Sequence, residues 1–181
     1  MKRSFLLALS LLPGLTAAIA ADNRVAPSII SDGLVAHWKL DTPALKDSGP
    51  HAIHGKLNGS ASFPDTSIGG HEMVLHGRDS FVRASHVEFN GLNESFSIAV
   101  FVRPRSSRAQ PLVTREDSAS QTGWLLEQRA DLGFQLRQPG DSGASIASPA
   151  NVLVPNRWAH IVAAVSRSGD SLTARLYVNA R

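Results

Sequence analysis

Three stretches with alternating apolar side chains constrain the fold of this chain more than any other feature of its sequence. They are ESFSIAVFVRP at Glu94–Pro104, RWAHIVAAVSR at Arg157–Arg167 and SLTARLYVN at Ser171–Asn179. Successive side chains of a β-strand point to opposite faces, so this period of two predicts three long strands. No stretch shows a comparable helical period.

In the first stretch, every second residue from Phe96 to Val102 is apolar, and these residues share one face of the predicted strand. Ala99 and Phe101 are apolar on the other face, so we expect the middle of the strand to be buried on both sides. Pro104 has no amide hydrogen and marks where pairing should stop.

Shorter strand candidates fill the rest of the chain, with turn signals every eight to twelve residues. The first is LVAHWKL at Leu34–Leu40, and Asn58–Gly59 is a strong hairpin signal between two short strands. The sequence therefore predicts an all-β fold, a two-sheet antiparallel β-sandwich or jelly roll. Further candidates are Ile53–Leu57, Ala61–Phe63, Glu72–Leu75, Ser80–Ala84, Leu112–Arg115, Gly123–Gln128, Gly133–Gln138 and Ala144–Ala147.

Composition excludes several classes of function. The 181 residues are 43% apolar, enough for one globular domain with an adequate core. With no cysteine, disulfides, thiolate zinc sites and a cysteine nucleophile are excluded. The arginines are scattered among carboxylates and serines instead of forming a basic face, so we expect no nucleic-acid partner.

The first twenty residues are typical of a secretory signal. Lys2 and Arg3 precede the apolar stretch Phe5–Leu12, and Ala18–Ala20 is a small-x-small cleavage site. We expect residues 1–20 to be a signal peptide, 21–32 a linker, and the protein to be exported to the periplasm, the cell surface or the medium. Without the leader the net charge falls from +3 to +1, and we expect no membrane span in the mature chain.

Six segments in order resemble the laminin G-like, concanavalin A-like jelly rolls of exported bacterial proteins. For example, GLVAHWKLD resembles the family's opening GLVAYWPFD, and FSIAVFVRP resembles FTISAWVKP. The resemblance implies a jelly-roll domain over 33–181. The six segments are Gly33–Asp41, Asp47–Gly55, Phe81–Arg83, Phe96–Pro104, Trp158–Val165 and Leu176–Asn179.

The family continues with at least two strands beyond the point that corresponds to Arg181. We therefore expect the jelly roll to be C-terminally incomplete in this sequence and to be followed by downstream domains of the same polypeptide.

The sequence gives no support for catalysis within these residues. Jelly-roll glycosidases can place their acids as Glu-x-Asp-x-x-Glu on one strand, which this chain lacks, and Glu116 and Asp117 are adjacent. Gly140–Gly143 matches the core of a serine-protease loop, but its composition is that of a turn and the flanking context of the histidine base is missing.

A calcium ion is the one cofactor that the resemblance suggests, because related sandwiches often hold one at the rim of a sheet. Asp41, Asp47 and Asp79 fall in loops that the resemblance places near one another, and carboxylates are preferred calcium ligands. The alternative is that these aspartates form turns through bonds to the backbone.

Sugar binding would call for exposed aromatic rings. Trp38 and Trp158 belong to strand cores in the family pattern, whereas Trp124 follows Thr122–Gly123 at the start of a strand and is the candidate ligand-binding residue.

These observations favour a non-catalytic recognition module that binds a glycan or a cell-surface protein and forms the N-terminal part of a larger exported protein. The alternatives are an accessory domain of an exported hydrolase whose catalytic part lies beyond Arg181, and a structural spacer.

Overall fold

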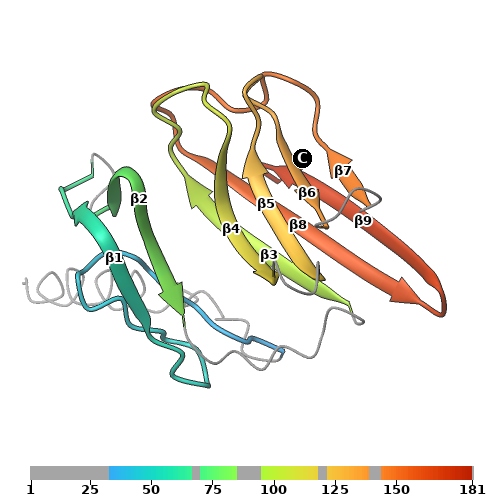
Figure 1. Ribbon diagram of the computed structural model, residues 1–181, viewed down its shortest axis with the longest axis horizontal. Coiled ribbons are helices and arrows are strands. Elements are labelled where there is room, and N and C mark those ends of the chain that lie inside the picture. The colour runs from blue at the N-terminus through green and yellow to red at the C-terminus, as the bar shows by residue number, and fades with distance from the viewer. Residues whose placement is uncertain (1–32, 67–69, 85–94, 118–121, 139–143, 181) are drawn as a thin grey trace, which may run out of the picture. The chain divides into compact units, whose positions relative to one another are not determined.

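The computed structural model describes residues 33–66, 70–84, 95–117, 122–138 and 144–180, and every regular element in them is a β-strand (Figure 1). The chain divides into two compact units, Met1–Val87 and Glu88–Arg181. The predicted signal peptide and linker lie outside the described residues. Within those residues there is no helix of the length and apolarity that crossing a membrane requires.

The structure contains nine strands in the described residues. In the first unit they are β1 (Gly55–Ser62) and β2 (Val74–Ala84); in the second they are β3 (Phe96–Val102), β4 (Gln110–Asp117), β5 (Thr122–Gln128), β6 (Phe134–Arg137), β7 (Ser145–Ala147), β8 (Ala159–Ser168) and β9 (Ser171–Val178). The separate strands predicted at Glu72–Leu75 and Ser80–Ala84 are one strand, β2.

The first unit contains one antiparallel pair, β1 with β2. Asn58 lies opposite Phe81 but Ser60 lies opposite His76, so β2 carries extra residues at this point. The predicted hairpin at Asn58 and Gly59 is therefore wrong, because the chain continues through it as one strand. Gly59 keeps a positive φ of 77°, which accommodates the irregularity in the pairing.

The predicted strand at Leu34–Leu40 is also wrong, since this segment contributes only an isolated bridge between Trp38 and Asp47. Its backbone is bonded to a turn and not to a neighbouring strand. The His37 N–H donates to the Asp47 carboxylate at 2.7 Å, and the His37 carbonyl accepts the Ser48 N–H at 2.8 Å.

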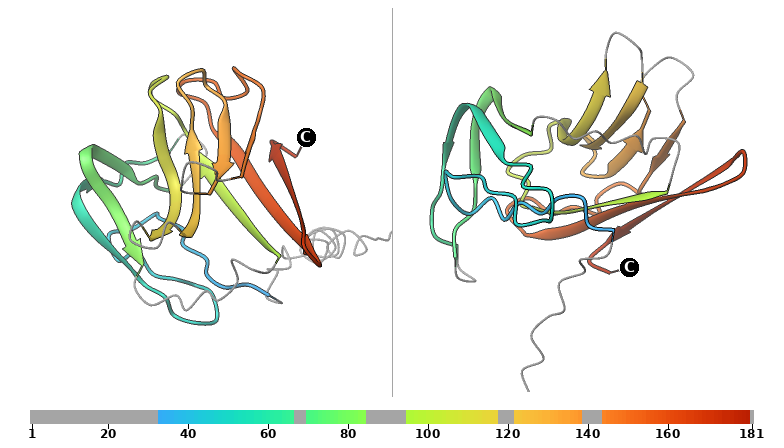
Figure 2. Two further views of the ribbon diagram at one scale, coloured as in Figure 1. Left: turned by 45° about the vertical axis from the view of Figure 1, so that its right-hand side comes forward. Right: turned by 90° about the horizontal axis from the view of Figure 1, so that it is seen from below.

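The second unit is a two-sheet antiparallel β-sandwich, which confirms the predicted fold class. One sheet has the order β3-β8-β9 and the other β4-β5-β6-β7 (Figure 2). Their inner faces share one core, as expected for stacked sheets. Its buried residues are Trp124, Leu126, Phe134, Leu136, Leu153, Ala159, Ile161, Ala163 and Val165.

The three long alternating stretches are strands, as predicted, and the structure pairs them in one sheet, β3-β8-β9. Along β8, every second residue from Ala159 to Val165 is buried, and the residues between them are partly exposed. β3 lies in register beside it, with Phe96 opposite Val165. The expectation that β3 is buried on both sides is wrong. Phe101 lies on the outer face of the sheet and is 69% exposed.

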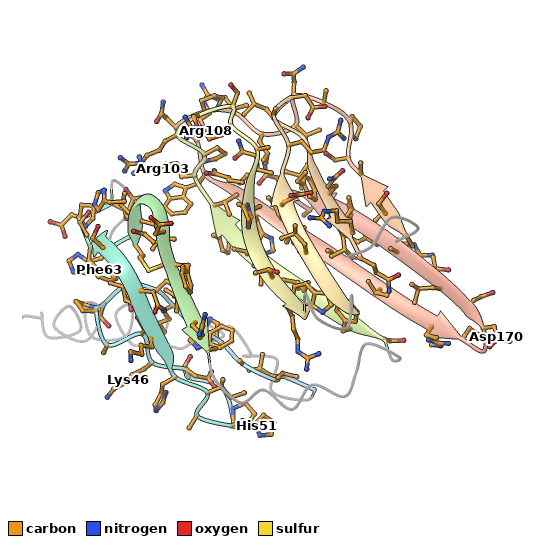
Figure 3. The ribbon with its side chains drawn as sticks, viewed as in Figure 1. Lys46, His51, Phe63, Arg103, Arg108 and Asp170 are labelled. Carbon is orange, nitrogen blue, oxygen red and sulfur yellow. The ribbon has the colours of Figure 1, made fainter. Side chains whose placement is uncertain are left out.

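A buried glutamine holds the connection between β3 and β4. Gln128 at the end of β5 has no exposed surface, and its side-chain amide donates to the carbonyls of Ser106 at 2.7 Å and Arg108 at 3.0 Å. Arg108 is labelled in Figure 3. A buried amide needs hydrogen-bond partners for its polar atoms, and here the partners are carbonyls of the loop that follows Val102 at the end of β3. The two bonds therefore hold this loop in place.

Candidate functional site

The outer face of the sheet β3-β8-β9 carries a group of aromatic side chains. We call Phe101, Trp158, His160 and Tyr177 the outer aromatic surface. Phe101 lies opposite His160 in the register, and their rings stack with centroids 4.4 Å apart and an interplanar angle of 23°. The guanidinium of Arg103 (Figure 3) lies over Trp158, 5.7 Å from the ring centroid, which is a cation–π contact.

Exposure separates these side chains from the aromatic residues of the core. Phe101 is 69% and Tyr177 is 38% exposed, whereas Phe134 is 1% exposed. Trp158 is half-buried and lies under Arg103, although the sequence suggested a place in the core. The sequence analysis did not identify the outer aromatic surface; the signal was that Phe101 alternates with the core-facing residues of its strand.

The outer face also carries positive charge. Arg103 lies at one end of the outer aromatic surface and Arg175 on β9 is exposed opposite Ala164. On these three strands, and at the adjoining positions Arg103, Trp158 and Asn179, no outward position that the structure describes is an Asp or Glu. These positions are Ser97, Ala99, Phe101, Arg103, Trp158, His160, Val162, Ala164, Ser166, Ser168, Ser171, Thr173, Arg175, Tyr177 and Asn179.

A second feature is a cavity of about 320 Å³ between the two sheets of the sandwich. We call it the inter-sheet cavity. Most of its lining side chains are apolar. It is lined by Phe96, Gly123, Trp124, Leu136, Arg137, Gln138, Ala144, Ser145, Ile146, Val165, Leu172 and Ala174.

Trp124, the predicted ligand-binding residue, is one wall of this cavity. The side chain is 9% exposed, and one face of its ring stacks on Phe96 with centroids 5.7 Å apart. Trp124 is therefore not an exposed platform for stacking a sugar. Its indole Nε1–H is buried and has no hydrogen-bond partner among the residues that the structure describes.

The three predicted calcium ligands do not come together. The described residues contain no group of three or more His, Cys, Asp or Glu side chains placed to hold a metal. Asp41 directly precedes the turn closed by the Leu45 N–H and the Thr42 carbonyl, and Asp79 is exposed on β2. Asp47 is 7% exposed and is used by the backbone.

The Asp47 carboxylate organises the turn around it. Oδ1 accepts the N–H groups of His37 and Gly49, each at 2.7 Å, and Oδ2 accepts the Ile53 N–H at 2.8 Å. Burial raises the pKa of Asp47, but these three hydrogen bonds and the nearby His54 outweigh it, so the pKa lies below its ordinary value. This arrangement favours the turn-forming alternative, and a calcium ion on these aspartates stays a prediction.

We expect removal of calcium with EGTA to leave the melting temperature unchanged. The reason is that both oxygens of Asp47 already accept backbone hydrogen bonds, so the carboxylate has little capacity left for a cation. Thermal unfolding followed by circular dichroism, with calcium and with EGTA, measures this. A melting temperature that rises with calcium concentration would show that the aspartates bind the ion after all.

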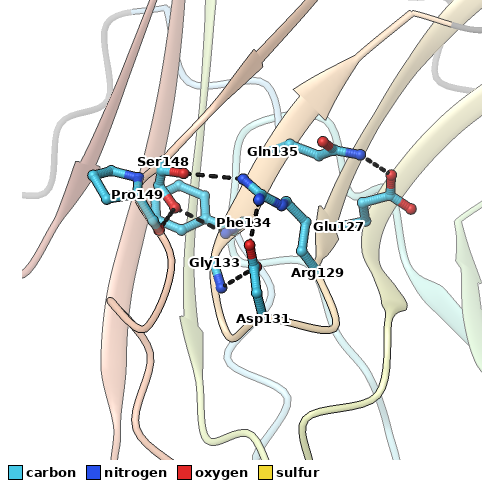
Figure 4. Close-up of polar contacts among 8 residues, drawn as sticks. All are labelled: Glu127, Arg129, Asp131, Gly133, Phe134, Gln135, Ser148 and Pro149. Atoms are coloured by element: carbon cyan, nitrogen blue, oxygen red, sulfur yellow. Dashed lines mark hydrogen bonds and ion pairs between the residues drawn. The ribbon is translucent and has the colours of Figure 1, made fainter.

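The carboxylates near the β5–β6 turn are also bound to neighbouring side chains and backbone (Figure 4). Asp131 forms an ion pair with Arg129 and accepts the Gly133 N–H at 2.9 Å. Glu127 accepts the Gln135 amide at 2.6 Å and the Nε–H of Arg137 at 3.0 Å. Asp131 therefore shapes the turn, and Glu127 links the strands β5 and β6.

Comparison with known proteins agrees with the fold. The family model described as the concanavalin A-like lectin/glucanases superfamily matches residues 76–181, more than half of the chain. No curated protein and no solved structure is significantly similar to the chain. The matched region contains all strands of the sandwich and the outer aromatic surface. The chain therefore belongs to the concanavalin A-like lectin/glucanases superfamily.

Proposed function

We propose that this chain is a non-catalytic recognition module of an exported protein, and that it binds a glycan through the outer aromatic surface. Laminin G-like domains bind glycans or proteins and are typically extracellular. We choose this surface as the binding site because Phe101 stacks on His160 in an exposed position and Tyr177 is exposed on the same face.

The chemistry of this surface suits a sugar. A pyranose has one face of C–H groups, which packs against the flat π face of an aromatic ring, while its hydroxyls need polar partners at the edge. Tyr177 offers a phenolic hydroxyl, and Asn179 is fixed beside the surface because its Oδ1 accepts the His160 N–H at 3.0 Å. The rings are held by a rigid sheet, so little conformational entropy is lost on binding.

The charge of the face favours an acidic glycan. Arg175 on β9 is exposed on it, and the outward positions described above include no carboxylate that would repel an anion. Arginine donates two parallel hydrogen bonds to carboxylate or sulfate groups. We therefore propose a glycan with uronic acid or sulfate groups. An array of neutral, uronate and sulfated oligosaccharides tests this proposal, and a loss of binding at high salt is expected because exposed charges are screened.

Export is part of the proposal. Its support is the pattern of charges, apolar residues and small residues in Met1–Ala20, and the typical location of laminin G-like domains. Further domains of the same polypeptide stay a prediction.

Replacing Phe101 with alanine is expected to weaken binding of the selected glycan about tenfold while the melting temperature changes little. The affinity falls because the sugar loses its stacking partner, which corresponds to about 1–2 kcal/mol. The stability is preserved because Phe101 is 69% exposed and buries little surface on folding. Isothermal titration calorimetry on the purified chain measures the affinity.

The matched control is Phe81→Ala, which removes an aromatic side chain that is 41% exposed on β2, in the other unit. This variant should bind the glycan as the wild type does. If Phe101→Ala binds with unchanged affinity, the outer aromatic surface is not the site. If the chain instead captures a protein and no glycan, the surface is a protein-binding site.

A further inference from the structure

The inter-sheet cavity lies within the sandwich, and its walls come from both sheets. Trp124 and Leu136 belong to β5 and β6, and Val165 and Ala174 face them from β8 and β9. Leu172 also lines the cavity and is 46% exposed, so the cavity reaches the surface near the β8–β9 turn. A volume of about 320 Å³ is within the range of small-molecule sites in proteins.

The buried indole N–H of Trp124 is the observation that points to a ligand. Tryptophan is a donor only, and a buried donor normally has a partner because leaving it unsatisfied is unfavourable. Trp38 follows this rule, since its Nε1–H donates to the Ile53 carbonyl at 2.7 Å. Among the described residues Trp124 has no such partner, although it is only 9% exposed and lines a cavity large enough to hold an acceptor.

The lining defines the chemical class of molecule that fits. Phe96, Ile146 and Val165 among others make most of the wall apolar, which favours a hydrocarbon body. Arg137 is the charged residue of the lining, and its Nε–H already donates to Glu127 at 3.0 Å. An ion would therefore find no unbalanced charge here, whereas a neutral acceptor such as a carbonyl or ether oxygen can take the Trp124 N–H.

We propose that the inter-sheet cavity is a second binding site, separate from the outer aromatic surface, and that it takes a small, uncharged, largely apolar molecule that accepts a hydrogen bond from Trp124 Nε1. The proposal goes beyond glycan recognition because the cavity lies on the inner side of the sheets. An apolar body of this kind would displace poorly bound water, and its acceptor would satisfy the buried donor.

A pair of probes of nearly the same shape tests the proposal. Cyclohexanone carries a carbonyl oxygen where methylenecyclohexane carries a CH₂ group. In ¹H–¹⁵N spectra of the wild-type chain we expect cyclohexanone to shift the indole N–H signal of Trp124 and to bind about fivefold more tightly, as one net hydrogen bond implies. The signal is assigned by its absence from Trp124→Phe.

Two variants separate the hydrogen bond from the cavity. In Trp124→Phe the fivefold preference for cyclohexanone should disappear, while both probes still shift the methyl signals of Ile146 and Val165. In Ala174→Leu the added atoms occupy part of the cavity, so the affinity of both probes should fall sharply. If Trp124→Phe does not fold, the wild-type preference and Ala174→Leu still decide the question.

Several outcomes would overturn the proposal. Equal affinity of the two probes for the wild type would show that Trp124 donates no hydrogen bond to the ligand. A Trp124 signal that no probe shifts would show that only water occupies the space. Shifts confined to Phe101 and His160 would place the probes on the outer aromatic surface, which removes this second site and leaves the glycan proposal standing.

Discussion

Replacing Phe134 with alanine is expected to lower the free energy of unfolding of the sandwich by about 3–5 kcal/mol. Phe134 lies on β6, is 1% exposed, and is among the largest fully buried side chains. Removing its ring loses apolar burial and leaves a void in the core cluster that also contains Leu126 and Ile161. The void can close only partly because the core is formed by two paired sheets. Since small domains are stable by about 5–15 kcal/mol, this is a large share of the total.

The backbone bonds of this position should survive the substitution. The Phe134 N–H donates to Ser148 Oγ at 2.9 Å (Figure 4), and alanine keeps that N–H. The variant therefore measures the side chain alone. Urea unfolding followed by tryptophan fluorescence gives the free energy from the midpoint and the slope.

Phe101→Ala is the matched control, because it deletes the same ring from the outer face of the sandwich. It should change the free energy of unfolding by less than about 1 kcal/mol, since the side chain is 69% exposed. Similar losses for Phe101→Ala and Phe134→Ala would mean that the outer face of β3 is covered as well as its inner face.

The sandwich could be predicted because each of its long strands is marked by a pattern of side chains within its own short segment of the sequence. From Thr173 to Val178 in β9, the alternation of residues corresponds directly to burial. Three such long stretches with turns between shorter strands leave few other folds. Matching the apolar face of each strand to a single core also fixes which side chains point inward. The register of β3 against β8, with Phe96 opposite Val165, comes from the structure, because a slip of two residues would keep the same faces inward.

The features that the sequence did not predict depend on partners distant in the chain. Asn58 and Gly59 have the composition of a hairpin, but pairing with β2 keeps them in a single strand. Alternation places Phe101 on the face opposite the core, yet it cannot tell whether another layer covers that face. The sequence marked Trp124 as a candidate ligand-binding residue, but only the packing of both sheets shows that its N–H is buried and that the side chain lines a cavity.

Replacing Asp47 with alanine is the second substitution with a large expected effect, a loss of about 3 kcal/mol in the stability of the first unit. The N–H groups of His37, Gly49 and Ile53 would all lose their acceptor. Hydrogen bonds to a charged group contribute about 1.5–3 kcal/mol each. Water can bond to the freed N–H groups in part, so the expected loss is smaller than the sum of the three. Asp65→Ala is the control, because the Asp65 side chain is 91% exposed and its ion pair with His71 contributes little.

Asp47→Asn separates the charge of this side chain from its shape. Asparagine keeps one oxygen for the N–H groups of His37 and Gly49, but its NH₂ group then faces the Ile53 N–H, and two donors cannot bond to each other. We expect Asp47→Asn to lose less stability than Asp47→Ala at neutral pH. Hydrogen exchange of these three amides reports on the turn directly.

The pH dependence of stability gives the sharpest test of this turn. The pKa of Asp47 is lower in the folded chain than in the unfolded chain, because three N–H groups bond the charged form. The unfolded chain therefore binds the proton more readily, and the stabilisation is fully present above the unfolded value of about 3.9. It is lost as the pH falls from there through the folded value. In urea unfolding between pH 7 and pH 3, the wild type should lose more stability than Asp47→Asn, which has no proton to bind at this position. Equal losses would show that the carboxylate is not held in its charged form by the turn.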